Sequence, residues 1–538
     1  MNQLAPLRQA EDGISIHDAP RFIARLAQWM TVFPIVLIMP LVSAGYPSAR
    51  VMAAGGTLTL TAADEQTDEP VITRMELWRG PIDGTAMPIR KAVPAGIGVV
   101  LDRSIELSLA DGSYAFRMIR GPEYRVVTGT FAMERTALDT HAVRLPRTIH
   151  MIQHGWTSGD CCVVGSKHSV PLRMAAEDLH VAAVLGQIEA SPIPYRDAAE
   201  PIRHDPTWIR EDCVHHDGLV AYGMSSIDAK QLPSELLVQA KSDDKSVKMA
   251  VENPFAWPLP VWLASGRVDG FFLMGDWLRL DRPVTRVTDG RRPDRSTSGA
   301  KAIGSWAYQI YTNILESGLR IPPLAGSGNE GVTTPIGYNR LYVAASPATS
   351  NFGAARTTTN LDAVAVSSSD AWWDAAWAGH SVATNGPLLR PTINGKLPGH
   401  VFTATGGEEL RLQPVLSLTT RDPVEYLEVV HNGQVHYRAR LDEFAKAGGK
   451  IPPIHADQSG WVIIHVVTKH KDMFRAAISA PWYIEFDGQP RVSAAAVHFF
   501  QDWLSMYETR LKRLPPGQLA RHVPFVRSAR KFWSDRQP

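Results

Sequence analysis

Residues 169–185 read S-V-P-L-R-M-A-A-E-D-L-H-V-A-A-V-L, and this stretch decides the fold. Residues 169–179 predict a helix, and residues 180–185 predict a strand because they are almost wholly apolar. A strand that follows a helix after so short a connection is typical of alternating α/β architecture.

The same alternation extends over residues 148–385. Further apolar runs predict strands at 270–274 and 339–344, and helical periodicity marks residues 234–241, 303–317 and 370–379. Alternation over such a length predicts an α/β barrel, in which reactive side chains sit at the carboxyl ends of the strands.

Short alternating runs broken by turns occur on both sides of this region. Residues 50–147 contain such runs at 57–61, 72–78, 104–109 and 113–119, and predict a β-sandwich of about seven strands. Residues 386–490 contain runs at 410–416, 424–431 and 460–468, with the hairpin signal Asn432-Gly433, and predict a second β-sandwich. Residues 491–538 predict an amphipathic helix with a basic tail, docked on this second β-domain.

The N-terminal 45 residues predict export. Arg21 and Arg25 precede the apolar run T-V-F-P-I-V-L-I-M-P-L-V at 31–42, and small residues follow it. This run is shorter than the roughly 20 residues that a spanning helix needs. We expect a periplasmic or secreted protein; an uncleaved anchor and a true start at Met30 are the alternatives.

Length and composition limit the number of domains and the classes of protein to which the chain can belong. A chain of 538 residues with 44% hydrophobic content and 15 Trp predicts about three or four globular domains. Lys plus Arg number 55 and Asp plus Glu 54, a balance that argues against a bulk nucleic-acid binder. The three cysteines form no disulfide scaffold; Cys213 could pair with Cys161 or Cys162, and buried free thiols are the alternative.

Several stretches resemble known families. D-G-S-Y-A-F-R-M-I-R-G-P-E-Y-R-V-V-T-G-T-F at 111–131 resembles a transthyretin-like or carboxypeptidase-regulatory-like sandwich. The middle region resembles the CehA and McbA branch of the polymerase-and-histidinol-phosphatase (PHP) superfamily. The motifs that carry this resemblance follow in order: H-G-W-T-S-G-D at 154–160, A-E-D-L-H-V-A-A-V at 176–184, P-V-W-L-A-S-G-R-V-D-G at 260–270, S-G-L-R-I-P-P-L-A-G-S-G at 317–328, P-I-G-Y-N-R-L-Y-V at 335–343 and S-V-A-T-N-G-P-L-L-R at 381–390.

This resemblance implies a multidomain α/β plus β fold. Its centre would be a PHP-like distorted (β/α)7 barrel at 148–385, flanked by the two β-sandwich domains and followed by the C-terminal helix. Such proteins hold two or three metal ions on histidines and carboxylates, and the metals activate water for attack on a phosphate ester, carbamate or related bond.

The metal ligands of that family are largely replaced in this sequence. The His-x-His pair that normally follows Gly-Asp corresponds to Cys162 and Val164. The Gly-Ser-Asp-x-His pattern reads Gly-Ser-Gly-Asn-Glu at 326–330, and no histidine occurs between Asp217 and Gly379. We therefore expect no histidine-rich cluster and no resident cofactor, although a single zinc ion on Cys162 and Asp276 stays compatible with the residue types.

The remaining candidates are polar side chains expected near the barrel mouth. His215-His216-Asp217-Gly218 reads as an exposed hairpin tip. The residues expected to carry the site are, for catalysis, Glu252, Asp276 and Glu330, and, for ligand binding, Glu177, His180, Trp277, Asn339 and Arg340.

The leading hypothesis is an exported PHP-like protein whose diverged pocket binds a small or carbohydrate-like ligand without the usual metals. One alternative is an active hydrolase of phosphoester, carbamate or glycoside bonds with a rebuilt carboxylate or single-metal site. The other is a structural surface protein. Contact of the basic C-terminal tail with a membrane surface or a protein is compatible with each of them.

Overall fold

The computed structural model describes residues 55–89, 92–165, 169–185, 204, 206–280, 284, 286–293, 299, 301–328, 334–345 and 365–536. All of the architecture below belongs to the compact unit that begins at Ala53. The predicted signal segment lies outside the described residues. Within them the fold is mixed α/β, with eight α-helices and strands in five sheets.

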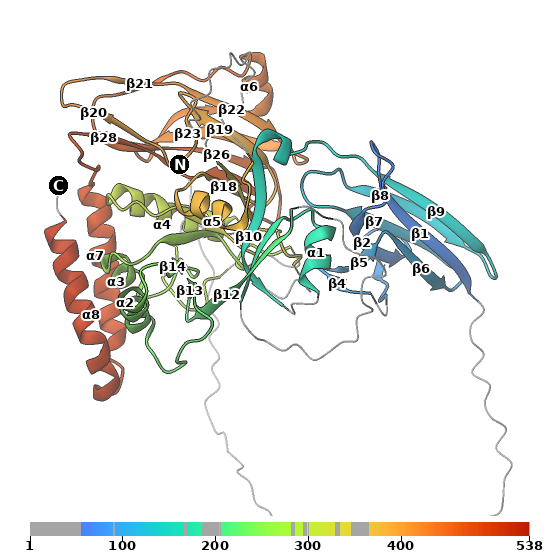
Figure 1. Ribbon diagram of the computed structural model, residues 1–538, viewed down its shortest axis with the longest axis horizontal. Coiled ribbons are helices and arrows are strands. Elements are labelled where there is room, and N and C mark those ends of the chain that lie inside the picture. The colour runs from blue at the N-terminus through green and yellow to red at the C-terminus, as the bar shows by residue number, and fades with distance from the viewer. Residues whose placement is uncertain are drawn as a thin grey trace, which may run out of the picture. The chain divides into compact units, whose positions relative to one another are not determined.

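The N-terminal region consists of two sheets that share one apolar core (Figure 1). Leu60, Met75 and Met118 are fully or almost fully buried in that core. The three-stranded sheet has the order β6-β1-β9, from β1 (Gly56–Asp64), β6 (Ser104–Leu109) and β9 (Leu138–Leu145). The six-stranded sheet has the order β4-β5-β2-β7-β8, with β3 on β2, from β2 (Ile72–Arg79), β3 (Thr85–Ala86), β4 (Pro94–Ala95), β5 (Gly98–Asp102), β7 (Gly112–Ile119) and β8 (Val127–Met133).

The middle region forms one half of a fifteen-stranded sheet, ordered β16-β15-β14-β13-β12-β11-β10-β17-β18. β10, β11 and β12 run parallel, as do β14, β15 and β16, whereas β13 is antiparallel to both neighbours. Its strands are β10 (Trp156–Val164), β11 (Val181–Leu185), β12 (Trp208–His216), β13 (Leu219–Tyr222), β14 (Lys248–Val251), β15 (Gly270–Met274), β16 (Pro323–Ala325), β17 (Arg340–Ala344) and β18 (Ser381–Thr384). Its helices are η1 (Ile152–His154), α1 (Val170–Ala176), α2 (Pro233–Asp243), α3 (Leu259–Ala264), α4 (Ala302–Glu316) and α5 (Ser369–Trp377).

The predicted helix and strand at 169–185 are both present, as α1 and β11. All five residues of β11 are buried, which explains why its sequence is apolar throughout rather than alternating. No strand ladder among the described residues closes the sheet into a barrel. The backbone N–H of Gly328, beyond β16, nevertheless donates to the carbonyl of Cys162 in β10 at 2.7 Å, so the two segments meet directly.

The sheet continues without a break past the expected boundary at residue 386, because β18 pairs with β27. The order β27-β26-β23-β24 follows, and β28 pairs with β26 and β20. Two further small sheets, β19-β22 and β21-β25, complete this region. Its elements are β19 (Leu388–Ile393), β20 (Val401–Ala404), β21 (Leu410–Leu412), β22 (Pro414–Thr419), β23 (Val424–His431), β24 (Gln434–Ala439), α6 (Leu441–Lys446), β25 (Ile454–Ala456), β26 (Gly460–Thr468), β27 (Ala476–Ser479) and β28 (Trp482–Phe486).

The hairpin expected at Asn432-Gly433 joins β23 to β24. Both residues have positive φ, 51° and 73°, as a tight two-residue hairpin turn needs.

The C-terminal segment is a helical hairpin, α7 (Ala494–Leu511) and α8 (Pro516–Asp535). The expectation that it docks on the second β-region is wrong: α7 and α8 pack on α3, and α7 also packs on α4 (Figure 1). Phe500 and Trp533 are buried here with their rings stacked at 4.8 Å, because apolar side chains of both helices face the middle region. No helix in the described part of the chain is both long and apolar enough to cross a membrane.

Candidate functional site

The carboxyl ends of the strands in the middle region form the predicted mouth. Asp160 lies in the middle of β10, in register with Ala182 near the start of β11, and is fully buried. Its carboxylate accepts hydrogen bonds from the backbone N–H groups of Cys162 (3.0 Å), Ser327 (3.0 Å) and Gly337 (2.7 Å). Burial raises the pKa of Asp160 to about 6, although these donors favour the ionised form. Asp160 therefore ties three chain segments together beneath the mouth.

Cys162 is only 2% exposed, and the three cysteines are free buried thiols rather than a disulfide. Burial raises the pKa of the Cys162 thiol well above its usual value, and the nearby carboxylates of Glu252, Asp160 and Asp276 raise it further. A metal needs the thiolate, which this environment disfavours. The surroundings of Cys162 therefore favour its neutral thiol.

Glu252 follows β14, and its carboxylate lies 3.5 Å from Nε2 of His215. The Glu252 side chain is 14% exposed and the His215 side chain 42%. The contact with Glu252 raises the pKa of His215 against the opposing effect of burial, and Asp217 and Asp276 add to the rise. These groups therefore form one electrostatic neighbourhood.

His215 was not among the predicted site residues. The expected hairpin is present, because β12 and β13 pair antiparallel around Asp217 and Gly218, both with positive φ. The expected exposure holds for His215 and Asp217 but is wrong for His216, which is buried. β13 then pairs antiparallel with β14, which brings His215 beside Glu252. No local signal could place them together, because this pairing depends on the sheet.

Asp276 follows β15 and forms an ion pair with Arg279 at 2.6 Å, with its side chain 37% exposed. Asn339 supports this loop, because its amide donates to the carbonyls of Gly275 (2.8 Å) and Leu278 (3.0 Å). Trp277 is 7% exposed and packs edge-on against Phe255. Asn339 therefore supports the loop that carries Asp276, and Trp277 anchors that loop in the core. Glu330 lies outside the described residues.

Glu177, His180 and Arg340 do not lie with the other candidates. β11 runs parallel to β10, and His180 immediately precedes β11. The backbone N–H of His180 donates to the carbonyl of Ser158 at 3.2 Å. Glu177 and His180 therefore lie at the amino end of β11, opposite the mouth, whereas Arg340 begins the antiparallel strand β17 and only its side chain reaches them. Glu177 pairs there with Arg74 at 2.6 Å, and Arg340 donates to the carbonyl of Glu177 at 3.1 Å.

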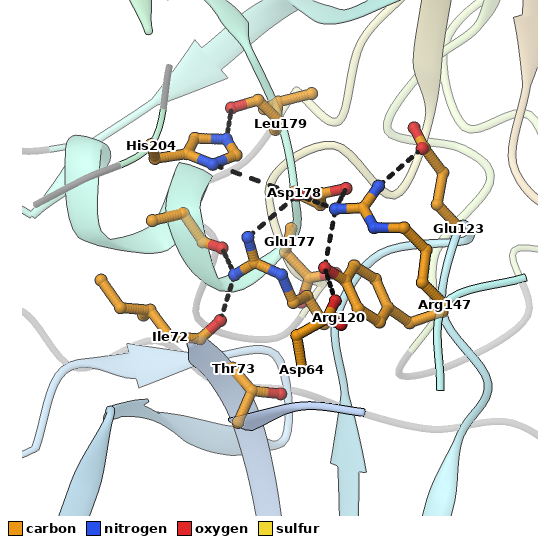
Figure 2. Close-up of polar contacts among 12 residues, drawn as sticks. Asp64, Ile72, Thr73, Arg120, Glu123, Arg147, Glu177, Asp178, Leu179 and His204 are labelled. Atoms are coloured by element: carbon orange, nitrogen blue, oxygen red, sulfur yellow. Dashed lines mark hydrogen bonds and ion pairs between the residues drawn. The ribbon is translucent and has the colours of Figure 1, made fainter. Parts of the chain in front are cut away.

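A buried polar network surrounds Asp178 at this amino end (Figure 2). The guanidiniums of Arg120 and Arg147 lie 2.9 and 3.0 Å from its carboxylate. Burial alone would raise the pKa of Asp178, but the two guanidiniums outweigh it and hold this pKa well below its usual range. Because both arginines belong to the N-terminal region and Asp178 to the middle region, the network joins the two regions. Arg147 also pairs with Glu123 at 3.0 Å.

Asp178, His180 and His204 could hold a metal ion. Each offers one ligand atom, and these atoms lie within 4.8 Å of one another. The two imidazoles are stacked, with ring centroids 4.5 Å apart and planes inclined by 13°. The sequence analysis named His180 as a ligand-binding residue but missed Asp178 and His204, since His204 follows His180 by 24 positions with no recognisable spacing.

The histidine-rich cluster of the PHP superfamily does not fit the described mouth. The surroundings of Cys162 favour its neutral thiol, and the carboxylate of Asp160 already accepts hydrogen bonds from backbone N–H groups. The imidazole that lies beside Glu252 is that of His215. Neither the family models nor the curated proteins with which the sequence was compared match this chain.

Proposed function

We propose that this protein binds a small, hydroxyl-rich ligand of carbohydrate type at the mouth, in a PHP-like barrel that works without the family's metal cluster. The observation that carries the proposal is the convergence of His215, Glu252 and Asp276. They come from the hairpin β12–β13 and from the carboxyl ends of β14 and β15. Ligands of α/β barrels bind at this end of the strands.

The chemistry of these groups suits hydroxyl groups. Carboxylates accept hydrogen bonds from vicinal hydroxyls, and the imidazole can donate or accept. Arg279 pairs with Asp276 and adds donors beside it. The partial exposure of His215 and Asp276 leaves them accessible to a ligand, whereas the buried Asp160 and Cys162 serve the framework.

A metal-independent hydrolase is the second candidate, favoured by the His215–Glu252 pair. Glu252 contacts Nε2 of His215, so the neutral ring could take a proton from water at Nδ1 while the resulting hydroxide attacks the ester carbonyl. The C–O bond to the alcohol would then break, and the leaving alkoxide would take the proton back from Nδ1. Glu252 would stabilise the imidazolium formed in that step.

We propose that any zinc ion lies away from the mouth, because the Cys162 thiol is a poor ligand in its buried setting. We also propose that the protein is exported, because residues 1–45 have the pattern of a secretory signal. Contact of the basic C-terminal helix with a protein or a membrane surface is a further part of the proposal.

A ligand screen in the presence of EDTA tests the proposal. Purified protein is screened against monosaccharides, disaccharides and uronic acids by thermal shift, and hits are titrated by calorimetry. We expect Glu252→Gln and Asp276→Asn each to weaken binding by at least about tenfold, the equivalent of losing one hydrogen bond to a charged group. Glu443→Gln is the matched control, because Glu443 pairs with Arg440 on the surface of α6.

Binding that survives both mouth variants would contradict the site, and two or more tightly held metal ions per chain would contradict the loss of the cluster. A screen of ester and phosphate substrates with the same variants decides between binding and hydrolysis. Turnover in EDTA that is lost in His215→Ala and kept in Glu443→Gln would establish the second candidate.

A further inference from the structure

A second cluster of ionisable groups lies at the amino end of β11, away from the proposed ligand site. We propose that Asp178, His180 and His204 bind a single divalent ion of the zinc class, as a structural metal beside the junction of the N-terminal and middle regions. Their side chains are at most 5% exposed, and their ligand atoms lie within 4.8 Å of one another. This proposal is independent of ligand binding at the mouth.

The hydrogen bonds of the two imidazoles set their tautomers. Nδ1 of His180 lies 2.9 Å from the carbonyl of Pro206, and Nε2 of His204 lies 3.0 Å from the carbonyl of Leu179 (Figure 2 shows the second contact). A carbonyl only accepts, so each of these nitrogens carries the proton. The other nitrogen of each ring therefore keeps its lone pair. Histidine ligands of metals are typically oriented by such a bond to a carbonyl.

Charge supports the same assignment. Both imidazoles are buried and each is held by a carbonyl, an environment that favours the neutral ring that a metal binds. Asp178 is ionised, because Arg120 and Arg147 hold its carboxylate. Two neutral imidazoles and one carboxylate, with a water molecule as fourth ligand, are a common zinc environment.

The same two arginines determine the class of cation. Magnesium and calcium need several carboxylate or carbonyl oxygens, and this cluster offers one carboxylate that is already shared with two guanidiniums. Zinc and cobalt bind through neutral nitrogen and tolerate that shortage of negative charge. Repulsion from Arg120 and Arg147 also predicts binding weak enough for a chelator to remove the ion.

The position of the cluster gives the metal a structural role. Asp178 and His180 precede β11, whereas His204 precedes β12, whose first residue donates to the carbonyl of His180 at 2.8 Å. An ion on all three side chains would fix the starts of two neighbouring parallel strands. Through Arg120, which follows β7, and Arg147, which follows β9, it would also reinforce the contact with the N-terminal region.

Metal titration of the full chain tests this site. After EDTA treatment and dialysis, zinc chloride is titrated by calorimetry, and cobalt(II) is added to a parallel sample for absorption spectroscopy. We expect one ion per chain, a rise in Tm with zinc, cobalt bands typical of nitrogen and oxygen ligands in four-coordinate geometry, and no competition from millimolar magnesium.

His180→Ala and His204→Ala should weaken zinc binding by at least about tenfold, as expected for a lost ligand. His380→Ala is the matched control, because Nδ1 of His380 also lies against a carbonyl, that of Pro398 at 2.7 Å. Circular dichroism shows whether each variant folds. Absence of zinc binding in the wild-type chain, or unchanged binding in folded His180→Ala and His204→Ala, overturns the proposal. If neither variant folds, a six-coordinate oxygen-only cobalt spectrum of the wild type overturns it.

Discussion

At the scale of the residue, Glu123 couples stability to pH. Its carboxylate accepts from the N–H of Met151 (2.9 Å) and the hydroxyl of Tyr342 (3.0 Å), and it pairs with Arg147. Burial and the charge of Asp178 together raise the pKa of Glu123 to about 7, although Met151, Arg147 and Tyr342 each lower it. Between these two pKa values the folded protein keeps Glu123 protonated, whereas Glu123 of the unfolded chain, with a pKa near 4.5, is ionised.

Stability from this proton is complete below about pH 4.5 and is lost as the pH rises to about 7, because ionising Glu123 costs the folded state alone. We expect the unfolding free energy to fall by about 3 kcal/mol over this window through Glu123. Glu123→Gln should remove this pH-dependent part of the unfolding free energy. Urea unfolding of the wild-type protein and the variant at pH 5 and pH 8 measures the difference. Since other groups such as Asp160 titrate equally in both, an identical pH dependence in both proteins would show that Glu123 does not titrate in this range.

At the scale of the element, α8 depends on one tryptophan. Trp533 is fully buried, stacks on Phe500 of α7, and donates from Nε1 to the carbonyl of Pro260 in α3 at 2.9 Å. The basic surface residues of α8 contribute little beside this anchor, because exposed ion pairs such as Arg530–Glu508 are worth at most about 1 kcal/mol.

Trp533→Ala should destabilise the docking of α8 by about 3–5 kcal/mol, the usual cost of emptying a large aromatic site. Hydrogen exchange and limited proteolysis would then show α8 released while the sheet stays protected. Val523→Ala, at a position of α8 that is 40% exposed, is the control and should change neither readout. Equal protection of α8 in Trp533→Ala would mean that other contacts hold the helix.

At the scale of the whole molecule, the N-terminal and middle regions depend on each other. Arg74, Arg120 and Arg147 of the first region neutralise Glu177 and Asp178 of the second. Removing one side of a buried ion pair costs about 3–5 kcal/mol, because the remaining charge stays buried without a partner.

A chain that begins at Thr148 should therefore fail to fold cooperatively, although it keeps every strand of the large sheet. A chain that begins at Ala53 keeps the whole compact unit and should unfold in the same transition as the full protein. Soluble yield and circular dichroism melts distinguish the two truncations. Cooperative unfolding of the chain from Thr148 would show that the middle region is an independent domain.

The sequence by itself determined the local elements. Periodicity located α1, β11, α4 and β15 to within a few residues, because burial of an apolar face dictates which residue types recur. Turn chemistry located the hairpins at Asp217-Gly218 and Asn432-Gly433, since positive φ favours these residues.

Only the tertiary structure decided which side chains share a site. Glu252, Asp276 and His215 meet because strands distant in the chain pair in one sheet, whereas Glu177 and His180 lie at the opposite strand end. The partners of Glu177 and Asp178 are 103 and 58 positions away, so no local pattern records them. Electrostatic environment follows from such long-range packing, and for that reason the residue types indicated Glu252 and Asp276 but not His215 beside them.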